Sequence, residues 1–382
     1  MSEGKTRPRP RKRAEKRGFA LGVASLGLML CLMLDAQTVI ASMKEGMHLV
    51  AHTMIPSLFP FMVVSEVIVR SGAGERIARP LCRVIRPLLG LNEAAGSALL
   101  LGLLCGFPVG SRAAADYYRA GRLTARQFVH VVCMCNVPSS AFLVSAVGLC
   151  LFGTARMGWT LVLFSLIAAL GVGALLRLLL PRGRDWTRCR RSVESGDTVD
   201  GPLLPASIAS AAGGMLHVCA TVLLFCVLMG ELSHLCQALM LDGVWRAVMA
   251  GVLELSTGVC AAAGLGSATL SPVLCAAMVG WAGLSVHCQI FAVCQGCPLP
   301  RGWFFLSRAL QSGLCALMMT IWMRVGGLTL PGPMTWRETM AVHHASPGGF
   351  SHVFCHLCGI LFFFAVFLWM LRRRKGKRRE RV

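Results

Sequence analysis

A succession of long apolar runs, separated by short basic blocks, constrains this chain more than any other feature. The runs are about 20 residues long, which is enough for a helix to cross the roughly 30 Å hydrocarbon core of a bilayer. Hydrophobic residues make up 55% of the 382 residues, a larger share than soluble domains have. The sequence therefore predicts an all-α polytopic membrane protein.

Eight of the runs are predicted to cross the bilayer. The first follows a basic segment but has no small-x-small cleavage site, so we interpret it as a retained span and not as a signal peptide. In chain order the predicted crossings are Phe19–Ala41, Gly46–Val69, Ala125–Leu151, Met157–Leu180, Ala206–Leu235, Ser271–Val293, Trp303–Val325 and Val353–Leu371.

Two further apolar segments are interrupted near their centres. Residues 95–120 contain GFPVG, and residues 245–266 contain LELSTG. Two crossings would need about 40 residues, and a single crossing does not tolerate such a break in hydrocarbon. We therefore predict that each segment forms a re-entrant hairpin, which enters and leaves the membrane on the same side.

The basic residues indicate the orientation of the chain. The net charge is +21, but the Lys and Arg residues lie in short blocks beside the apolar runs, a pattern typical of cytoplasmic flanks and not of a nucleic-acid-binding face. With two re-entrant hairpins the arginine-rich loops fall on one side. We therefore expect a bacterial inner membrane, both termini in the cytoplasm, and anionic lipid against the basic termini.

The predicted domain order follows from these assignments. It comprises a basic N-terminus 1–18, a first transmembrane helix 19–41, a first repeat 45–180, a cytoplasmic linker 181–204, a second repeat 205–325, an extracytoplasmic loop 326–352, a last transmembrane helix 353–371 and a basic tail 372–382.

The two repeats are supported by residues that match at a constant offset. His52 matches His217, and Glu66 matches Glu231 at the same offset. Each half then has a span, a broken hairpin and a span with a polar break. Because each half crosses the membrane three times, the second half begins on the opposite side and has the opposite orientation. This is the inverted-topology repeat of many secondary transporters. We expect the two histidines to be packing or interface residues and the two glutamates to be solvated near span ends.

Five segments resemble those of the Gate-domain proteins, also called nucleoside-recognition domain proteins, and within them the YlbJ-type sporulation integral membrane proteins. In order, over residues 45–325, they are IPSLFPFMVVSEVIVRSG, LGLLCGFPVGSR, CNVPSSAF, GVLELSTGV and GWAGLSVHCQ. The resemblance implies a core like that of concentrative nucleoside transporters, with two hairpins and two broken helices around a central site, and a setting in endospore formation. The chain departs from the family's Ser-Gly-Pro sequence after the asparagine, where it has VPSS.

The interrupted segments carry the residues that we expect to bind a solute. Glycine and proline free backbone groups at mid-depth, and a ligand can satisfy them. An ionisable residue inside a membrane segment is rare and usually functional, so Glu254 is the strongest candidate, for a solute hydroxyl or amine or for a coupling cation. Its structural alternative is an ion pair with Arg112 or Arg308. The full candidate set is Glu254, Ser256, Thr257, Asn136, Ser139, Ser140, Ser285, His287, Gln289, Gly106, Pro108 and Arg112.

Catalysis and a bound cofactor have no support in the sequence. It contains no G-x-S-x-G, H-E-x-x-H or P-loop pattern, so we expect a protein that is not an enzyme, with no cofactor beyond a coupling cation. Most of the 18 cysteines lie in apolar runs, where cysteine is usually a small apolar residue. The His- and Cys-rich segment 343–358 does not match a standard zinc site, so no metal centre is predicted.

These observations leave two functional hypotheses open. The first is transport, or gated passage, of a small polar solute, nucleoside-like or other, by alternating access around the broken helices. The alternative is a non-transporting membrane assembly factor needed for spore cortex or coat formation. The sequence leaves the oligomeric state open, a homo-oligomer included.

Overall fold

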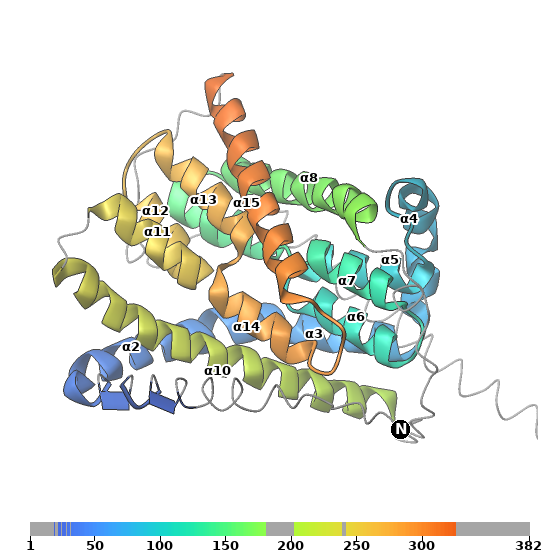
Figure 1. Cartoon of the computed structure of the whole chain (residues 1–382), viewed down its shortest axis with the longest axis horizontal. Coiled ribbons are helices and arrows are strands. Elements are labelled where there is room, and N and C mark those ends of the chain that lie inside the picture. The colour runs from blue at the N-terminus through green and yellow to red at the C-terminus, as the bar shows by residue number, and fades with distance from the viewer. Residues whose placement is uncertain are drawn as a thin grey trace, which may run out of the picture. The chain divides into compact units, whose positions relative to one another are not determined.

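The computed structural model describes residues 32–180, 202–238 and 242–325, and part of the chain between residues 19 and 31 (Figure 1). Every described element is helical, and two of them, η1 and η2, are π-helical. The elements are α2 Ala36–Leu49, η1 Val50–Met54, α3 Ile55–Arg70, α4 Ala73–Leu89, α5 Glu93–Cys105, α6 Val109–Arg119, α7 Ala125–Met134, η2 Phe142–Leu151, α8 Ala155–Leu179, α10 Leu203–Ala238, α11 Gly243–Leu253, α12 Leu255–Ala263, α13 Leu270–Trp281, α14 Gly283–Val293 and α15 Arg301–Arg324.

Within the described residues, four helical stretches are long and apolar enough to cross a membrane, and they match four of the predicted crossings. A fifth is added if the bent pair Ser25–Leu34 and Ala36–His52, whose parts meet at 95°, counts as one span. The N-terminus 1–18, residues 181–201 of the linker, residues 326–352, the predicted crossing Val353–Leu371 and the basic tail lie outside the described residues. The four stretches are Ala155–Leu179, Leu203–Leu232, Leu270–Val293 and Arg301–Arg324.

The second helix of the chain begins earlier than predicted. Asp35 caps α2 and its side chain accepts a hydrogen bond from the Thr38 amide at 3.3 Å. An aspartate at this position satisfies amides that the first turn leaves unpaired. Residues 36–41, which we had assigned to the first crossing, therefore belong to the helix that continues through α2, η1 and α3 to Arg70.

Both interrupted segments fold as helical hairpins. In the first, Ser97 on α5 and Tyr117 on α6 are hydrogen-bonded at 3.1 Å across the two arms. In both hairpins the arms come closest at a pair of glycines near the tip. A Cβ on Gly110 would lie 2.5 Å from the Cα of Gly102, and a Cβ on Gly258 would lie 2.2 Å from the Cα of Gly251. The arms are therefore antiparallel, and GFPVG and LELSTG form the two tips.

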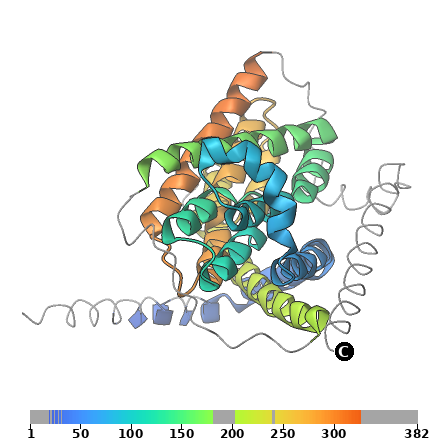
Figure 2. The same ribbon diagram turned by 90° about the vertical axis from the view of Figure 1, so that its right-hand side faces the viewer.

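The first helices of the two halves pack against each other along their length. Helix α10 contacts both α2 and α3 (Figures 1 and 2). The spacing along the pair shows that they run in opposite directions, because Gly46 on α2 approaches Cys226 while Gly214 on α10 approaches Met62 on α3. The halves also meet where α6 contacts α14 and where α12 contacts η2. The antiparallel pairing agrees with the predicted inverted repeat, which stays a prediction.

Helix α8 shows how the spans divide between lipid and protein. Trp159, Leu163 and Ile167 are all about half exposed and, at intervals of four residues, lie on one face. The opposite face is buried and includes the small residues Ala169 and Gly173. Small residues let membrane helices approach closely. The large apolar side chains therefore face lipid and the small ones face the helices that position the two breaks.

Candidate functional site

The first hairpin tip rests on the break that follows it in the chain. The Phe107 amide donates to the Val137 carbonyl at 3.0 Å, and the Phe107–Pro108 bond is cis. Gly106 has φ 81°, and a Cβ there would lie 2.6 Å from the Ser139 amide nitrogen. Only glycine combines this backbone conformation with so close an approach. Three of the predicted site residues, Gly106, Pro108 and Ser139, therefore meet at one place.

Asn136 forms the polar centre of this first break. It is fully buried, and its Oδ1 accepts from the Ser111 hydroxyl at 2.7 Å while its Nδ2 donates to the Val132 carbonyl. Ser111 lies on α6, so the asparagine joins the hairpin to the broken helix. Ser140, predicted for the same group, is half-buried.

Arg308 on α15 satisfies carbonyls that the break leaves free. Its guanidinium donates to the Cys133 carbonyl at 2.6 Å and to the Asn136 carbonyl. Both carbonyls lie at the C-terminal end of α7, where the helix carries partial negative charge, so the cation is placed where the helix dipole favours it. The side chain packs over the ring of Phe304, with 5.9 Å from Cζ to the centroid.

The charge of Arg308 has an unusual environment. The residue is 0% exposed, and its Nε has no hydrogen-bond partner among the residues that the structure describes. Among the described residues, no ion pair involves it. A buried cation held only by carbonyls has capacity for one more acceptor. Sequence reasoning considered Arg308 only as a partner for Glu254, although an arginine within an apolar run was itself a sufficient signal.

Glu254 forms the tip of the second hairpin. It ends α11 and caps α12, where its Oε2 accepts from the Thr257 amide at 2.7 Å and from the Thr257 hydroxyl at 2.9 Å. The residue is 3% exposed. A Cβ on Gly283 would lie 3.2 Å from the Glu254 Cα, so this tip also rests on the break that follows it. Ser256, next to it, is half-buried.

The second break is held by a histidine. Ala282 has φ 72° and separates α13 from α14, and the freed Trp281 carbonyl lies 2.8 Å from Nε2 of His287. Because a carbonyl only accepts, Nε2 carries the proton and Nδ1 presents a lone pair when the ring is neutral. Nδ1 is buried and has no hydrogen-bond partner in the described part of the chain. The ring packs edge-on against Phe304, with centroids 5.1 Å apart.

Phe304 thus separates two polar side chains with unsatisfied nitrogens. Arg308 offers a donor at Nε, and His287 offers an acceptor at Nδ1. Arg308 binds carbonyls of the first break, and His287 lies at the second break. The remaining predicted residues of the second half, Ser285 and Gln289, are buried and lie 3.5 Å apart between their side-chain oxygen and nitrogen.

Arg112 has a role other than those considered from the sequence. Its Nε lies 3.4 Å from Glu66, and its Nη2 donates to the Ser210 carbonyl and hydroxyl at 2.7 Å each. It joins α6 to α3 and α10. The alternative in which Glu254 pairs with Arg112 or Arg308 finds no support, since these arginines bind Glu66 and carbonyls respectively.

The glutamates that match in the two halves differ from expectation. Glu66 is 5% exposed and accepts from Arg70 at 2.8 Å, so it is buried and ion-paired and not solvated. Oε1 of Glu231 is likewise buried, without a hydrogen-bond partner. His52 and His217 are exposed at the surface of the paired helices, where an interface role stays a prediction.

Metal ligands do not gather within the described residues. No group of three or more His, Cys, Asp or Glu side chains there could hold a metal ion. Cys294 is buried at the end of α14 and forms no disulfide with another described cysteine. The segment 343–358 lies outside the described residues.

Comparisons with known proteins show two similarities. Residues 51–154, from η1 to the end of η2, match the family model described as Gate, nucleoside recognition. The chain is 20% identical over 315 residues to the sporulation integral membrane protein YlbJ of Bacillus subtilis (strain 168), which covers 73% of this chain and 76% of the relative. No solved structure matches. The chain is therefore an integral membrane protein that is similar to the Gate, nucleoside recognition, family over residues 51–154 and to a YlbJ-type sporulation protein over most of its length.

Proposed function

We propose that this protein carries a small polar solute across the bacterial cell membrane by alternating access around its two breaks. The observation that supports this most is Arg308, a fully buried cation with an unpartnered Nε, held by carbonyls of a broken helix. Ionisable groups inside a membrane bundle are costly and usually mark a solute or ion pathway. In many secondary transporters such groups and broken helices meet near the midplane.

The chemistry of the breaks fits an uncharged solute with hydroxyl or amide groups. Arg308 Nε can donate to it, His287 Nδ1 can accept from it, and the second oxygen of Glu254 can accept from it or bind a coupling cation. Asn136, Ser285 and Gln289 add further polar groups. A nucleoside has both kinds of group, and the name of the matching family model supports it as a first candidate.

Alternating access needs contacts between the halves that open on one side at a time. Arg119, at the end of α6, donates to the Val293 and Gln295 carbonyls at 2.9 and 3.1 Å, and so ties the first hairpin to the end of α14. The contact of α12 with η2 is its counterpart in the other half. In the proposed mechanism one contact closes the cytoplasmic side while the other closes the outside.

The membrane topology that goes with this mechanism has eight crossings. Both hairpins re-enter, the two termini are cytoplasmic, and the basic termini bind anionic lipid. The proposal is supported by the positive-inside bias of the loops and by the antiparallel pairing of α10 with α2 and α3.

Uptake by proteoliposomes tests the proposal directly. The purified full-length protein is reconstituted, and uptake of a panel of labelled nucleosides, amino acids and metal ions is measured against empty liposomes. Binding is measured in parallel as a solute-dependent shift of the unfolding temperature. We expect one chemical class to be taken up and to stabilise the protein. If no candidate gives either signal, transport of a small polar solute is overturned.

Glu254→Gln separates a binding role from a capping role. Glutamine keeps the side-chain oxygen that accepts from Thr257 but removes the charge, so the fold should survive while affinity for a cation or a donor falls. We expect at least about tenfold slower uptake, equivalent to about 1.4 kcal/mol, with an unfolding temperature close to that of the wild type. Equal uptake by the two proteins would show that Glu254 is only a helix cap.

An assembly function is the alternative, and it is favoured by one observation. The name of the curated relative refers to sporulation and to an integral membrane protein, without a transported solute. A membrane assembly factor for spore cortex or coat would use its surface and not its breaks. A sporulation phenotype that persists unchanged in Glu254→Gln and Asn136→Ala, together with the absence of uptake, would support this alternative.

A further inference from the structure

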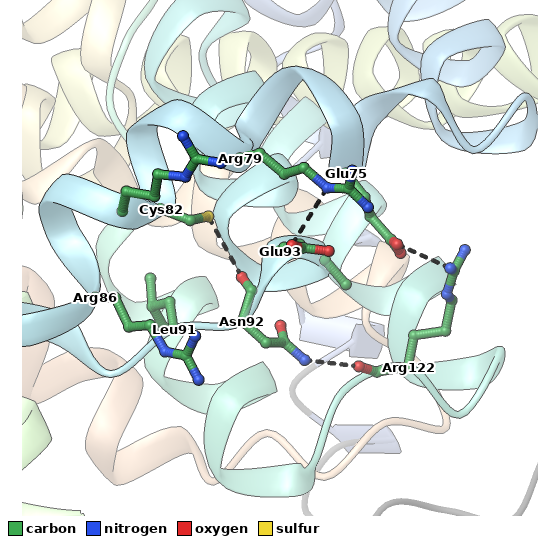
Figure 3. Close-up of a pocket in the computed structure, with 10 residues that line it drawn as sticks. Glu75, Arg79, Cys82, Arg86, Leu91, Asn92, Glu93 and Arg122 are labelled. Carbon is green, nitrogen blue, oxygen red and sulfur yellow. Dashed lines mark hydrogen bonds and ion pairs between the residues drawn. The ribbon is translucent and has the colours of Figure 1, made fainter.

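A second polar site lies away from the two breaks. A pocket of about 660 Å³ is formed by α4, the start of α5 and the turn that follows α6 (Figure 3). Four arginines and two glutamates line it, so its walls carry an excess of positive charge. The charged residues are Glu75, Arg79, Arg83, Arg86, Glu93 and Arg122.

Two of these arginines are already neutralised, and two are not. Arg79 pairs with Glu93 at 3.3 Å, and Arg122 pairs with Glu75 at 2.8 Å. Arg83 and Arg86 have no ion pair within the part of the chain that the structure describes. One turn of α4 separates them, so both guanidinium groups can reach the same anion.

The wall opposite these arginines is ordered by hydrogen bonds. Asn92 caps α5 by accepting from the Ala95 amide at 2.8 Å, and its Nδ2 donates to the Arg122 carbonyl at 3.1 Å. The Cys82 thiol donates to the Asn92 carbonyl at 3.6 Å, as Figure 3 shows. Burial, with a smaller effect of the Glu93 carboxylate, raises the pKa of Cys82, so this thiol stays protonated. These hydrogen bonds fix the position of the pocket wall formed by the start of α5.

The two faces of α4 indicate that the pocket lies at the membrane interface, near the lipid headgroups. Ile77 and Leu88 are three turns apart on one face of this helix and are 46% and 53% exposed, while Arg79 and Arg86 lie on the opposite face. A helix with an exposed apolar face and a basic face lies in the plane of the membrane interface. An excess of arginine is typical of protein segments on the cytoplasmic side of a membrane, where anionic lipids attract them.

We propose that this pocket binds the phosphate group of an anionic phospholipid through Arg83 and Arg86. The planar guanidinium matches the oxygens of a phosphate and binds them with two parallel hydrogen bonds, which lysine cannot do. The ion pairs of Arg79 and Arg122 with the glutamates hold the rest of the pocket open. This site is distinct from the breaks and does not depend on the transport proposal.

Thermal unfolding of the purified full-length protein in a zwitterionic detergent tests this assignment. Phosphatidylglycerol or phosphatidylcholine is added in the same micelles, and the apparent affinity is obtained from the rise in unfolding temperature. We expect phosphatidylglycerol to stabilise the wild type more than phosphatidylcholine. In the double variant Arg83→Gln/Arg86→Gln its apparent affinity should fall by at least about tenfold, as expected for two lost guanidinium contacts to an anionic surface.

Arg76→Gln is the matched control, because Arg76 is exposed on the same helix and does not line the pocket. It removes the same kind of charge and should leave the affinity within about twofold of the wild type. Equal losses in the control and the double variant, or no preference for phosphatidylglycerol, would overturn the site.

Inorganic phosphate and glycerol phosphate are added alone to find out whether the bound phosphate comes from a lipid or from a soluble molecule. If inorganic phosphate or glycerol phosphate stabilises the protein and phosphatidylglycerol does not, the lipid assignment is wrong and the pocket binds a soluble phosphate.

Discussion

Replacing Arg308 with methionine is expected to destabilise the protein by at least about 2 kcal/mol, because two buried carbonyls lose the charged group that donates to them. These carbonyls, of Cys133 and Asn136, belong to the backbone and cannot be removed together with the arginine. Relief of the buried cation opposes the loss only in part, since the end of α7 already compensates the charge. The measurement is thermal unfolding in detergent, with a thiol-reactive dye that reports exposure of the buried cysteines.

Two variants make this result specific. Arg324→Met removes an arginine from the exposed end of the same helix, and should change stability by less than about 0.5 kcal/mol. Arg308→Lys keeps the charge but not the fork that reaches both carbonyls, so it should recover part of the loss. If Arg308→Met unfolds at the wild-type temperature, the guanidinium does not hold the break.

The close contact between glycines in each hairpin predicts a second large effect on stability. Gly258→Ala is expected to destabilise the protein by about 3 kcal/mol, because the added methyl group would lie 2.2 Å from the Cα of Gly251 and the arms must separate. The contact is with backbone, which cannot move aside as a side chain can. Gly110→Ala, at 2.5 Å from the Cα of Gly102, should behave in the same way in the first hairpin. Unfolding temperature and the yield of monodisperse protein report the effect.

Gly313→Ala is the control for this pair. Gly313 lies inside α15 with no atom within 4 Å of an added Cβ, so alanine should stabilise the helix by about 0.5–1 kcal/mol. Opposite signs for Gly258→Ala and Gly313→Ala are the expected outcome. A neutral Gly258→Ala would mean that the two arms are not in contact in the membrane.

The elements that follow from local sequence were predictable. GFPVG and LELSTG marked the hairpin tips because two glycines and a proline fall close together in the first, and a glutamate followed three residues later by a threonine can cap a new helix in the second. The Asp35 cap was also readable, but the apolar run continued across it and masked the boundary. These features depend on a few neighbouring residues and on no distant contact.

The contacts of the site were less predictable, because tertiary packing decides them. Arg308 was visible as a cation in an apolar run, but which carbonyls it reaches depends on how the backbone breaks at Asn136. Arg112 follows the GFPVG tip in sequence, yet it pairs with Glu66, which is distant in the chain. The spacing of Glu254 and Thr257 does predict a local cap, because an acceptor three residues before an amide can satisfy it at a helix start.

The pairing of α10 with α2 and α3 makes the two halves of one chain resemble the subunits of a dimer. In a twofold dimer each subunit offers the same patch to the other, so a contact made once is made again with the roles exchanged. Here the exchange takes place between the first and second halves, with antiparallel helices in contact along their length. A contact at one end of the pair therefore has an equivalent at the other end, made by different residues of the two halves. These residues can diverge in sequence, as the contact of Arg112 with Ser210, which joins the first half to the second, illustrates.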